Sequence, residues 1–371
     1  MRIIILTTSL SGGGAEFVAR CWAIWLSEHG SDVRVLTTSP APARILEGGA
    51  RVRTLKGRTH LGVARSLRAE LAREPADAVL ALQSYPNLVA IAALSGRGRS
   101  GPALVISERN ITTRENEPVR FGDRSKMWLA KRLYSRADLA IAVSHPVAAQ
   151  LIGAFGMRAG QVVVVPNPSG RSSEQRVVAG AAAAPGRGAT PVPIDRPLHL
   201  VLPLRLVPQK RVELAVSAVA LLRAGGIDAR LLCFAQGPGR GRLEAVARAA
   251  GVPLTIPGWA EDWVSETPPG SVVVLPSYRE GFGNVLVEAA LGGIPSVAVS
   301  NAYGVADALV PTITGELAFA GTPEALAEAV LRARGSTMRH VTGWARRFST
   351  DESGRLLTAS LHKAIARSRT T

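Results

Sequence analysis

The stretch SVVVLPSYREGFGNVLVEAALGGIPSVAVS, residues 271–300, contains a complete strand–loop–helix–strand unit. An apolar run at 271–277 precedes a glycine-containing loop, a helical segment at 285–292 and a second apolar run at 295–300. Such alternation predicts parallel strands connected by helices, and therefore an α/β fold. The unit also carries two carboxylates, Glu280 in the loop and Glu288 in the helix. Their spacing suggests a binding site.

The same alternation extends outward in both directions. The predicted strands of the first half are 2–8, 32–38, 77–82, 103–108, 139–144 and 161–166, and those of the second half are 198–206, 229–235, 253–258, 271–277 and 295–300. Helices are expected at 211–225, 239–250 and 285–292, and 323–369 is almost wholly helical. We therefore predict two Rossmann-like domains, with the carboxyl ends of both sheets around one cleft.

A change of composition separates the two halves. Residues 169–197 are rich in Ser, Ala, Gly and Pro and lack apolar periodicity, which predicts a linker or mobile loop. The first domain is accordingly placed at 1–168, and the second begins at 198.

Composition restricts the class of protein. The chain has 371 residues, 47% of them hydrophobic, and two cysteines that are far apart in sequence. No apolar run approaches the roughly 18 residues needed to span a bilayer. We interpret MRIIILTTSL as a buried strand rather than a signal peptide, and expect a reduced, cytosolic protein without disulfides.

The net charge of +16 has two open explanations. One is compositional drift toward arginine, with a solvated basic surface, and the other is an anionic partner. The basic segment at 120–139 contains Trp128 and Tyr134 and suits either a solvated helix face or a membrane surface. Nucleic acid is not expected, because aromatic residues make up only 5% of the chain.

Two segments suit phosphate. SGGGAE at 11–16 places glycines before a helix, whose N-terminus attracts anions, although a glycine turn without a ligand is an open alternative. In LRLVPQK, we expect Arg205 at the end of a strand and Lys210 just before a helix. Two cations there suit a diphosphate, and a solvated loop is the alternative.

The loop of the opening stretch combines sugar and phosphate chemistry. Gly281 and Gly283 keep it thin, Asn284 is the expected N-cap, and the amides of residues 285–287 are expected to point unpaired N–H groups toward the cleft. Carboxylates accept hydrogen bonds from vicinal hydroxyls, so Glu280 suits a sugar and Glu288 a ribose.

Together these motifs resemble the nucleotide-sugar site of retaining GT-B glycosyltransferases of family 4. The combination of EGFGNVLVE at 280–288 with Arg205 and Lys210 is the specific part of the resemblance. SGGGAE, ERN at 108–110, VPNP at 165–168 and the C-terminal helices around Trp344 and Phe348 extend it over nearly the whole chain.

The resemblance implies a role for each matching residue. Glu280, Arg205 and Lys210 would be catalytic. Glu108, Arg109 and Asn110, following a strand and facing the cleft, would bind the acceptor, and a polar loop that only holds the fold together is the open alternative. The donor site would consist of Gly13, Gly14, Arg205, Lys210, Gly258, Trp259, Glu280, Gly281, Phe282, Gly283, Asn284, Val285, Leu286 and Glu288. No metal and no cofactor are implied.

The resemblance also implies a reaction and a location. It predicts a metal-independent hexosyltransferase that moves a sugar from a nucleotide diphosphate sugar to a hydroxyl acceptor. A second domain at 198–350 and a helix at 351–371 that crosses back to the first domain would complete the fold. A lipid-linked glycan is the preferred acceptor, in surface polysaccharide assembly at the inner face of the membrane. The alternatives are a small-molecule acceptor, a GT-B epimerase or phosphorylase, and a non-catalytic basic protein.

The chain departs from the family pattern in three places. Leu204 stands where a glycine usually precedes the arginine, residues 235–238 read AQGP, and SERNITTREN stands where many relatives carry a histidine. Neither of the first two departures removes a charge from the donor site.

Overall fold

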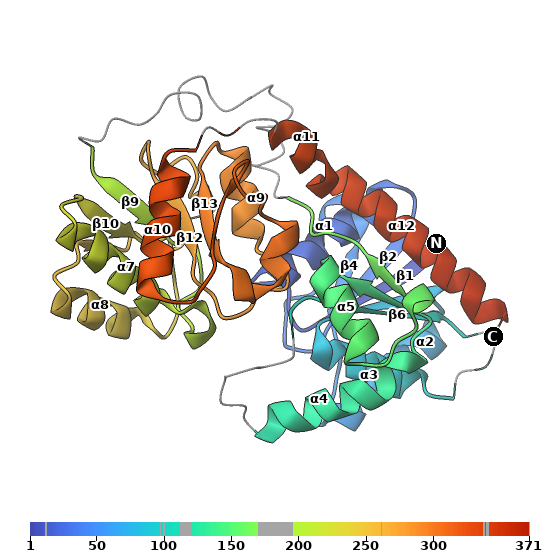
Figure 1. Cartoon of the computed structure of the whole chain (residues 1–371). Helices are drawn as coiled ribbons and strands as arrows, with labels where there is room; N and C mark the ends of the chain where they lie inside the picture. The colour runs from blue at the N-terminus through green and yellow to red at the C-terminus, as the bar shows by residue number, and fades with distance from the viewer. Residues whose placement is uncertain are drawn as a thin grey trace. The chain divides into compact units, whose positions relative to one another are not determined.

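The computed structural model describes residues 1–11, 13–96, 98, 101–111, 121–169, 196–260, 262–336, 338 and 341–370. The chain forms two compact units: unit 1 is Met1–Pro168 with Phe348–Thr371, and unit 2 is Ser169–Arg347. Each unit contains one largely parallel sheet with helices packed against it (Figure 1). The prediction of an α/β protein with two Rossmann-like domains is therefore confirmed. Most of the predicted linker at 169–197 lies outside the described residues.

Sheet A of unit 1 has the strand order β3-β4-β2-β1-β5-β6-β7-β8. Its pairs are parallel except for β3 with β4. The strands are β1 (Arg2–Thr7), β2 (Asp32–Thr37), β3 (Arg44–Ile45), β4 (Arg51–Thr54), β5 (Ala78–Leu82), β6 (Ala103–Glu108), β7 (Leu139–Ala142) and β8 (Val162–Val164).

Sheet B of unit 2 is parallel and has the strand order β11-β10-β9-β12-β13-β14. The strands are β9 (Leu198–Val201), β10 (Ala229–Leu232), β11 (Leu254–Thr255), β12 (Val272–Leu275), β13 (Ser296–Val299) and β14 (Gly315–Ala318). The chain moves outward from β9 in one direction and from β12 in the other. The topological switch point, where ligands bind in open α/β sheets, therefore lies between β9 and β12.

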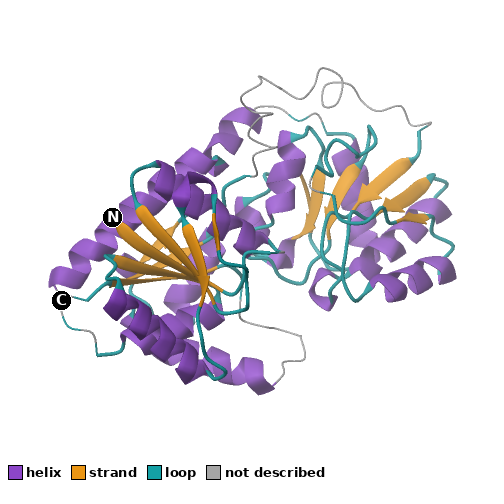
Figure 2. Cartoon of the chain, turned by 180° about the vertical axis from the view of Figure 1, so that it is seen from behind, coloured by secondary structure: helices purple, strands orange, loops and turns teal. Residues whose placement is uncertain are grey.

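Helices cover the sheets of both units (Figure 2). In unit 1 they are α1 (Gly14–Glu28), α2 (His60–Arg73), α3 (Ser84–Leu94), α4 (Phe121–Leu133), α5 (His145–Gly153) and α12 (Thr350–Thr370). In unit 2 they are α7 (Val212–Ala224), α8 (Arg240–Ala249), α9 (Asn284–Leu291), α10 (Pro323–Arg334) and α11 (Val341–Ala345).

The last helix, α12, belongs to unit 1 and completes its core. Leu357, Leu361 and Ala364 of α12 are fully buried in the same apolar cluster as Ile3 and Ile5 of β1. Burial of each leucine side chain stabilises the unit by about 1.5–3 kcal/mol.

Polar contacts fix the start of α12 against α1. The indole N–H of Trp22 donates to Ser353 Oγ at 2.9 Å, and that hydroxyl donates to the carbonyl of Pro166 at 2.8 Å. The Trp25 indole donates to Asp351 Oδ1 at 3.1 Å. A β-carbon at Gly354 would overlap the Trp25 ring, so only glycine fits at this crossing.

Three strands were not predicted, and their composition explains why. β4 has the sequence RVRT, β3 has only two residues, and β14 has the sequence GELA, so each lacks a continuous β-branched run. The predicted strand at 198–206 is also shorter than expected, because β9 ends at Val201. Its continuation, LPLRL at 202–206, is interrupted by Pro203 and is joined to the neighbouring segment by an isolated bridge between Arg205 and Gln236.

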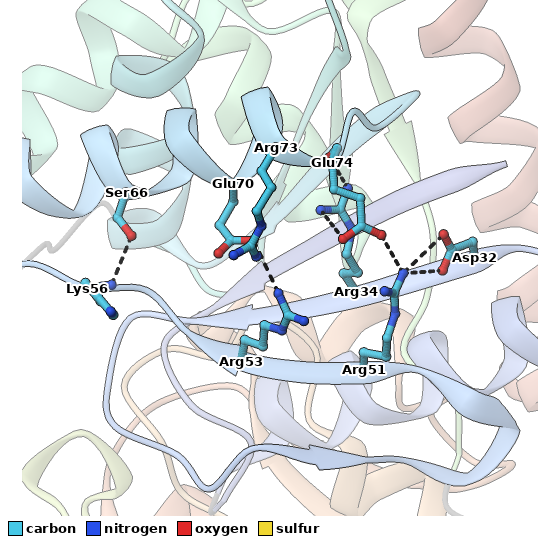
Figure 3. Close-up of polar contacts among 9 residues, drawn as sticks. All are labelled: Asp32, Arg34, Arg51, Arg53, Lys56, Ser66, Glu70, Arg73 and Glu74. Carbon is cyan, nitrogen blue, oxygen red and sulfur yellow. Dashed lines mark hydrogen bonds and ion pairs between the residues drawn. The ribbon is translucent and has the colours of Figure 1, made fainter.

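Arginines of β2, β4 and α2, near one edge of sheet A, are paired with carboxylates (Figure 3). Arg51 of β4 contacts Asp32 at 2.9 Å and Glu74 at 2.7 Å, and Arg34 of β2 contacts Glu74 at 3.4 Å. A second group lies beside it, in which Arg53 and Arg73 contact Glu70 at 3.9 and 2.6 Å. Much of the positive charge here is therefore neutralised locally, and the ion pairs hold β2, β4 and α2 together.

Candidate functional site

Charged residues converge at the carboxyl edge of sheet B. Lys210 follows β9, and Glu280 follows β12, the neighbouring strand. Lys210 Nζ donates to Glu280 Oε1 at 2.5 Å, and Glu280 is only 8% exposed. This ion pair spans the switch point of sheet B. It brings together two residues that the sequence assigned to one site.

The loop that carries Glu280 is held by the two residues flanking Lys210. Gln209 accepts from the amide of Tyr278 at 3.0 Å and donates to the carbonyl of Arg279 at 2.8 Å. Arg211 Nε donates to the carbonyl of Pro276 at 2.8 Å, and its guanidinium lies 4.3 Å from the centre of the Tyr278 ring. Gln209 and Arg211 were not identified from sequence. They flank Lys210, which the sequence did identify.

Arg211 adopts a conformation that favours glycine. Its φ is +45° and its ψ is +47°, at the N-cap of α7. Burial lowers the pKa of its guanidinium, and the nearby Tyr278 opposes that shift. Left-handed backbone outside glycine is strained, so the contacts with 276–278 must outweigh the strain.

Gly283 sets the start of α9. It has a φ of +96° and is the N-cap, whereas Asn284 is the first helical residue. The prediction that Asn284 caps the helix is therefore wrong, because the turn needs the left-handed conformation that glycine adopts freely. The amide of Leu286 donates to the Gly283 carbonyl at 3.0 Å, so the expectation of an unpaired N–H at Leu286 is also wrong.

Glu288 lies in the second turn of α9 and shares its carboxylate with the protein. The indole N–H of Trp263 donates to Glu288 Oε2 at 2.9 Å. Burial raises the pKa of Glu288, and this hydrogen bond acts against the rise. Trp263 belongs to the apolar core of unit 2, and no sequence signal pointed to it.

The remaining predicted donor residues of unit 2 follow strands β9, β11 and β12. Arg205 follows β9 and is exposed. Gly258 and Trp259 follow β11; Gly258 has a φ of +114°, and Trp259 is 53% exposed. Phe282, in contrast, is buried, between the loop glycines Gly281 and Gly283.

Glu108 in unit 1 has a different environment. It is the last residue of β6 rather than part of a following loop, and it is 3% exposed. Tyr134 donates to its carboxylate at 2.9 Å and Ser84 at 3.2 Å. Burial raises its pKa to about 7. The expectation that Glu108 faces a cleft is corrected, because its carboxylate is enclosed by these partners.

Arg109 and Asn110 follow Glu108 and make local contacts. Arg109 Nη1 donates to Ser107 Oγ at 3.2 Å, a second guanidinium nitrogen donates to Asn167 Oδ1, and the guanidinium lies 4.8 Å from the Trp22 ring. Burial lowers its pKa to about 9. Asn110 Oδ1 accepts from the amide of Ile111 at 2.9 Å.

The glycine turn of unit 1 precedes α1. Gly13 is its N-cap and Gly14 its first residue, and Gly12 lies outside the described residues. In the first turn, Glu16 accepts from Gln83 Nε2 at 3.3 Å. Gln83 follows β5, the neighbour of β1, so this contact spans the switch point of sheet A.

A metal centre is not apparent in the part of the chain that the structure describes. No group of three or more His, Cys, Asp or Glu residues there is arranged to hold an ion. Among the described helices, none is long and apolar enough to cross a membrane.

Comparison with protein families matches both units. Residues 12–168 match the model described as Glycosyltransferase Family 4, and residues 198–334 match the one described as Glycosyl transferases group 1. The two models together span most of the chain. The chain belongs to the GT-B glycosyltransferases.

Known relatives resemble part of this GT-B glycosyltransferase. An exopolysaccharide phosphotransferase of Streptomyces coelicolor is 33% identical over 37% of this chain and 15% of its own length. A GDP-mannose-dependent α-(1-6)-phosphatidylinositol dimannoside mannosyltransferase of Mycobacterium tuberculosis is 31% identical over 38% of this chain and 37% of its own. The matches thus span well under half of either relative.

A solved structure resembles the GT-B glycosyltransferase over its whole length. The structure of Alr3699/HepE from Anabaena in complex with UDP-glucose covers 98% of this chain and 99% of its own, with a TM-score of 0.71 and 20% identity. This likeness establishes the fold.

Proposed function

We propose that the chain transfers a sugar from a nucleotide diphosphate sugar to a hydroxyl acceptor, with retention of the anomeric configuration. The observation that carries the proposal is the Lys210–Glu280 pair at the switch point of sheet B, beside the N-terminus of α9. A cation, a carboxylate and a helix N-terminus at one place suit the diphosphate and the sugar of such a donor. The names of the mannosyltransferase relative and of the UDP-glucose complex support a nucleotide-sugar donor.

In this proposal each part of the donor has its own partners. Arg205 and Lys210 bind the diphosphate with the α9 terminus at Val285, Glu280 accepts from a sugar hydroxyl, and Glu288 accepts from the ribose. Gly258 and Trp259 meet the base. On binding, the diphosphate would compete with Glu280 for Lys210, so that the carboxylate turns to the sugar as the lysine turns to the phosphate.

The proposed reaction requires no metal ion. The charge that develops on the leaving diphosphate would be stabilised by Arg205, Lys210 and the positive end of α9. The loop that leads into α9 is held by Gln209 and Arg211, so that the helix N-terminus is in place before the donor binds.

For the acceptor we propose the hydroxyl of a lipid-linked glycan in surface polysaccharide or glycolipid synthesis. The names of the exopolysaccharide and phosphatidylinositol mannoside relatives support this class. Because Glu108 and Arg109 are bonded within unit 1, we assign them an indirect part, in shaping the acceptor domain. A small-molecule acceptor is the rival.

A lipid-linked acceptor requires the enzyme to reach a membrane, and α4 offers a suitable surface. Arg124, Lys126, Lys131 and Arg132 are exposed on it, and Trp128 is 58% exposed. Basic residues with an interfacial aromatic suit anionic lipids. We propose a peripheral location at the cytoplasmic face of the membrane. Binding to anionic vesicles that weakens with added salt would support it, and salt-independent binding would not.

The decisive experiment is a screen of nucleotide diphosphate sugars by thermal shift, followed by product analysis. A donor that binds only the folded state raises the unfolding temperature. The product should be a glycoside with the anomeric configuration of the donor, determined by NMR. Release of an epimer or a sugar phosphate would instead indicate an epimerase or phosphorylase. If the protein binds its ligand equally well after both Glu280 and Glu288 have been replaced, this would indicate a non-catalytic protein.

A further inference from the structure

A tyrosine with an unusual backbone lies beside Glu280. Tyr303 follows β13, between the short 3-10 turns η5 (Ser300–Ala302) and η6 (Gly304–Asp307). It pairs with Glu280 in a parallel bridge, and the Glu280 amide donates to the Ala302 carbonyl at 3.0 Å. Because β13 neighbours β12, the loop after β13 runs alongside the loop that carries Glu280.

The conformation of Tyr303 is one that a side chain disfavours. Its φ is +48° and its ψ is −60°, close to the rare classic γ-turn. Glycine would adopt this geometry with little strain. Strained residues of this kind concentrate at binding and catalytic sites, where the surrounding structure holds them in place.

The neighbours of Tyr303 show what holds it. A β-carbon at Gly304 would overlap the Glu280 carbonyl and the Gly281 backbone, so the two loops are in direct contact. Ala302 and Val305 on either side are buried, whereas Tyr303 itself is 54% exposed. The loop is thus anchored around a tyrosine that contributes little to the core. A purely structural role would not explain why an exposed tyrosine occupies a position with a strained backbone.

We propose that Tyr303 forms one wall of the subsite for the sugar ring of the donor, next to Glu280. The proposal rests on the proposed function. One face of a hexopyranose carries mainly C–H groups, which pack against an aromatic ring, while its hydroxyls bond to a carboxylate. Tyr303 would then determine how well the sugar is bound and would have little effect on the nucleotide.

The experiment compares Tyr303→Gly with Tyr303→Phe and with a matched control. Thr312→Gly is that control, because Thr312 also has a positive φ, +66°, but lies in the turn before β14. Calorimetry measures the dissociation constants of UDP, UDP-glucose, GDP and GDP-mannose, and thermal unfolding is followed for each variant. The pair of nucleotide and nucleotide sugar that the wild type binds is used for all variants.

Both glycine variants should unfold at a higher temperature than the wild type, because each relieves backbone strain. Tyr303→Gly alone should bind the nucleotide sugar about tenfold more weakly, with free nucleotide affinity unchanged. Tyr303→Phe should bind both as the wild type does.

Three results would overturn the proposal, and they are distinguishable. Unchanged sugar-nucleotide affinity in Tyr303→Gly overturns this inference alone. Equal weakening of nucleotide and nucleotide sugar, together with a lower unfolding temperature, assigns Tyr303 a structural role and overturns it as well. A wild type that binds none of the four probes overturns the proposed function, and this inference with it.

Discussion

An acidic residue lies at the carboxyl edge of each sheet, and the two residues have different surroundings. At sheet B, Glu280 is held in an ion pair with Lys210, within a loop braced by Gln209 and Arg211. At sheet A, Glu108 is enclosed by the hydroxyls of Tyr134 and Ser84, and burial raises its pKa to about 7. A position at the end of a strand therefore does not define a site. The two acids differ in their hydrogen-bond partners: Glu280 accepts from the ammonium group of Lys210, whereas Glu108 accepts from two neutral hydroxyls.

The largest effect is expected at Glu280. Glu280→Gln should lower sugar transfer by about 10- to 150-fold, because a charge-assisted hydrogen bond to the sugar is lost. Free nucleotide diphosphate should bind no more weakly, since Lys210 is released from its ion pair. Transfer assays and calorimetry measure the two quantities. Glu108→Gln is the control: a comparable loss of transfer there would remove the distinction between the edges.

The second effect concerns stability rather than activity. The pKa of Glu108 is raised on folding from 4.5 to about 7, so the folded state holds a proton that the unfolded state releases. Stability should then fall as the pH rises through this window, by about 3 kcal/mol. Glu108→Gln should show a flatter dependence between pH 5 and 8 in urea unfolding. Parallel curves for the two proteins would contradict this assignment.

Arg211 tests whether the brace around Glu280 matters for catalysis. Arg211→Met should lower transfer about tenfold, because the carbonyl of Pro276 loses its donor and the loop loosens. Arg223→Met is a matched control, since Arg223 also donates to a carbonyl, that of Ala229, in the last turn of the same helix. Equal loss of transfer in both variants would show that only general stability is involved.

A smaller effect is expected at Glu288. Glu288→Gln should weaken free nucleotide by several-fold only, because Trp263 already shares the carboxylate. Calorimetry with nucleotide diphosphate measures it directly. Trp263→Phe, which releases that oxygen, should leave nucleotide affinity equal or improved, and a strong loss would indicate that Trp263 itself orients Glu288.

The last prediction is that removal of metal ions has no effect on sugar transfer. Adding a chelator should leave transfer unchanged if Arg205, Lys210 and the α9 terminus stabilise the leaving diphosphate. Loss of turnover that magnesium restores would show that a cation shares this task.

Much of the fold followed from local pattern. The β-branched runs predicted the strands that build the core, and β6 was located to the residue. The strands missed lack such a run, and in β4 the alternating arginines form ion pairs with carboxylates that are distant in sequence. Local propensity does not contain that information.

The sequence assigned candidate residues that lie in short motifs, and it gave no signal for residues whose contacts come from distant parts of the chain. Lys210 and Glu280 were assigned to one site because both follow strands, and their ion pair agrees with that placement. Arg211, Trp263 and Tyr303 gave no signal, because their contacts join residues far apart in sequence or depend on a backbone conformation.

The return of α12 to unit 1 has a consequence for biosynthesis. Leu357, Leu361 and Ala364 are buried in the same core as β1, yet the ribosome adds them after the whole of unit 2. Unit 1 is the first to be translated but cannot close its core until its last helix has emerged. A nascent chain would therefore display the surface of α1 around Trp22 and Trp25 while unit 2 already folds, and chaperones that hold exposed apolar surface would meet it there.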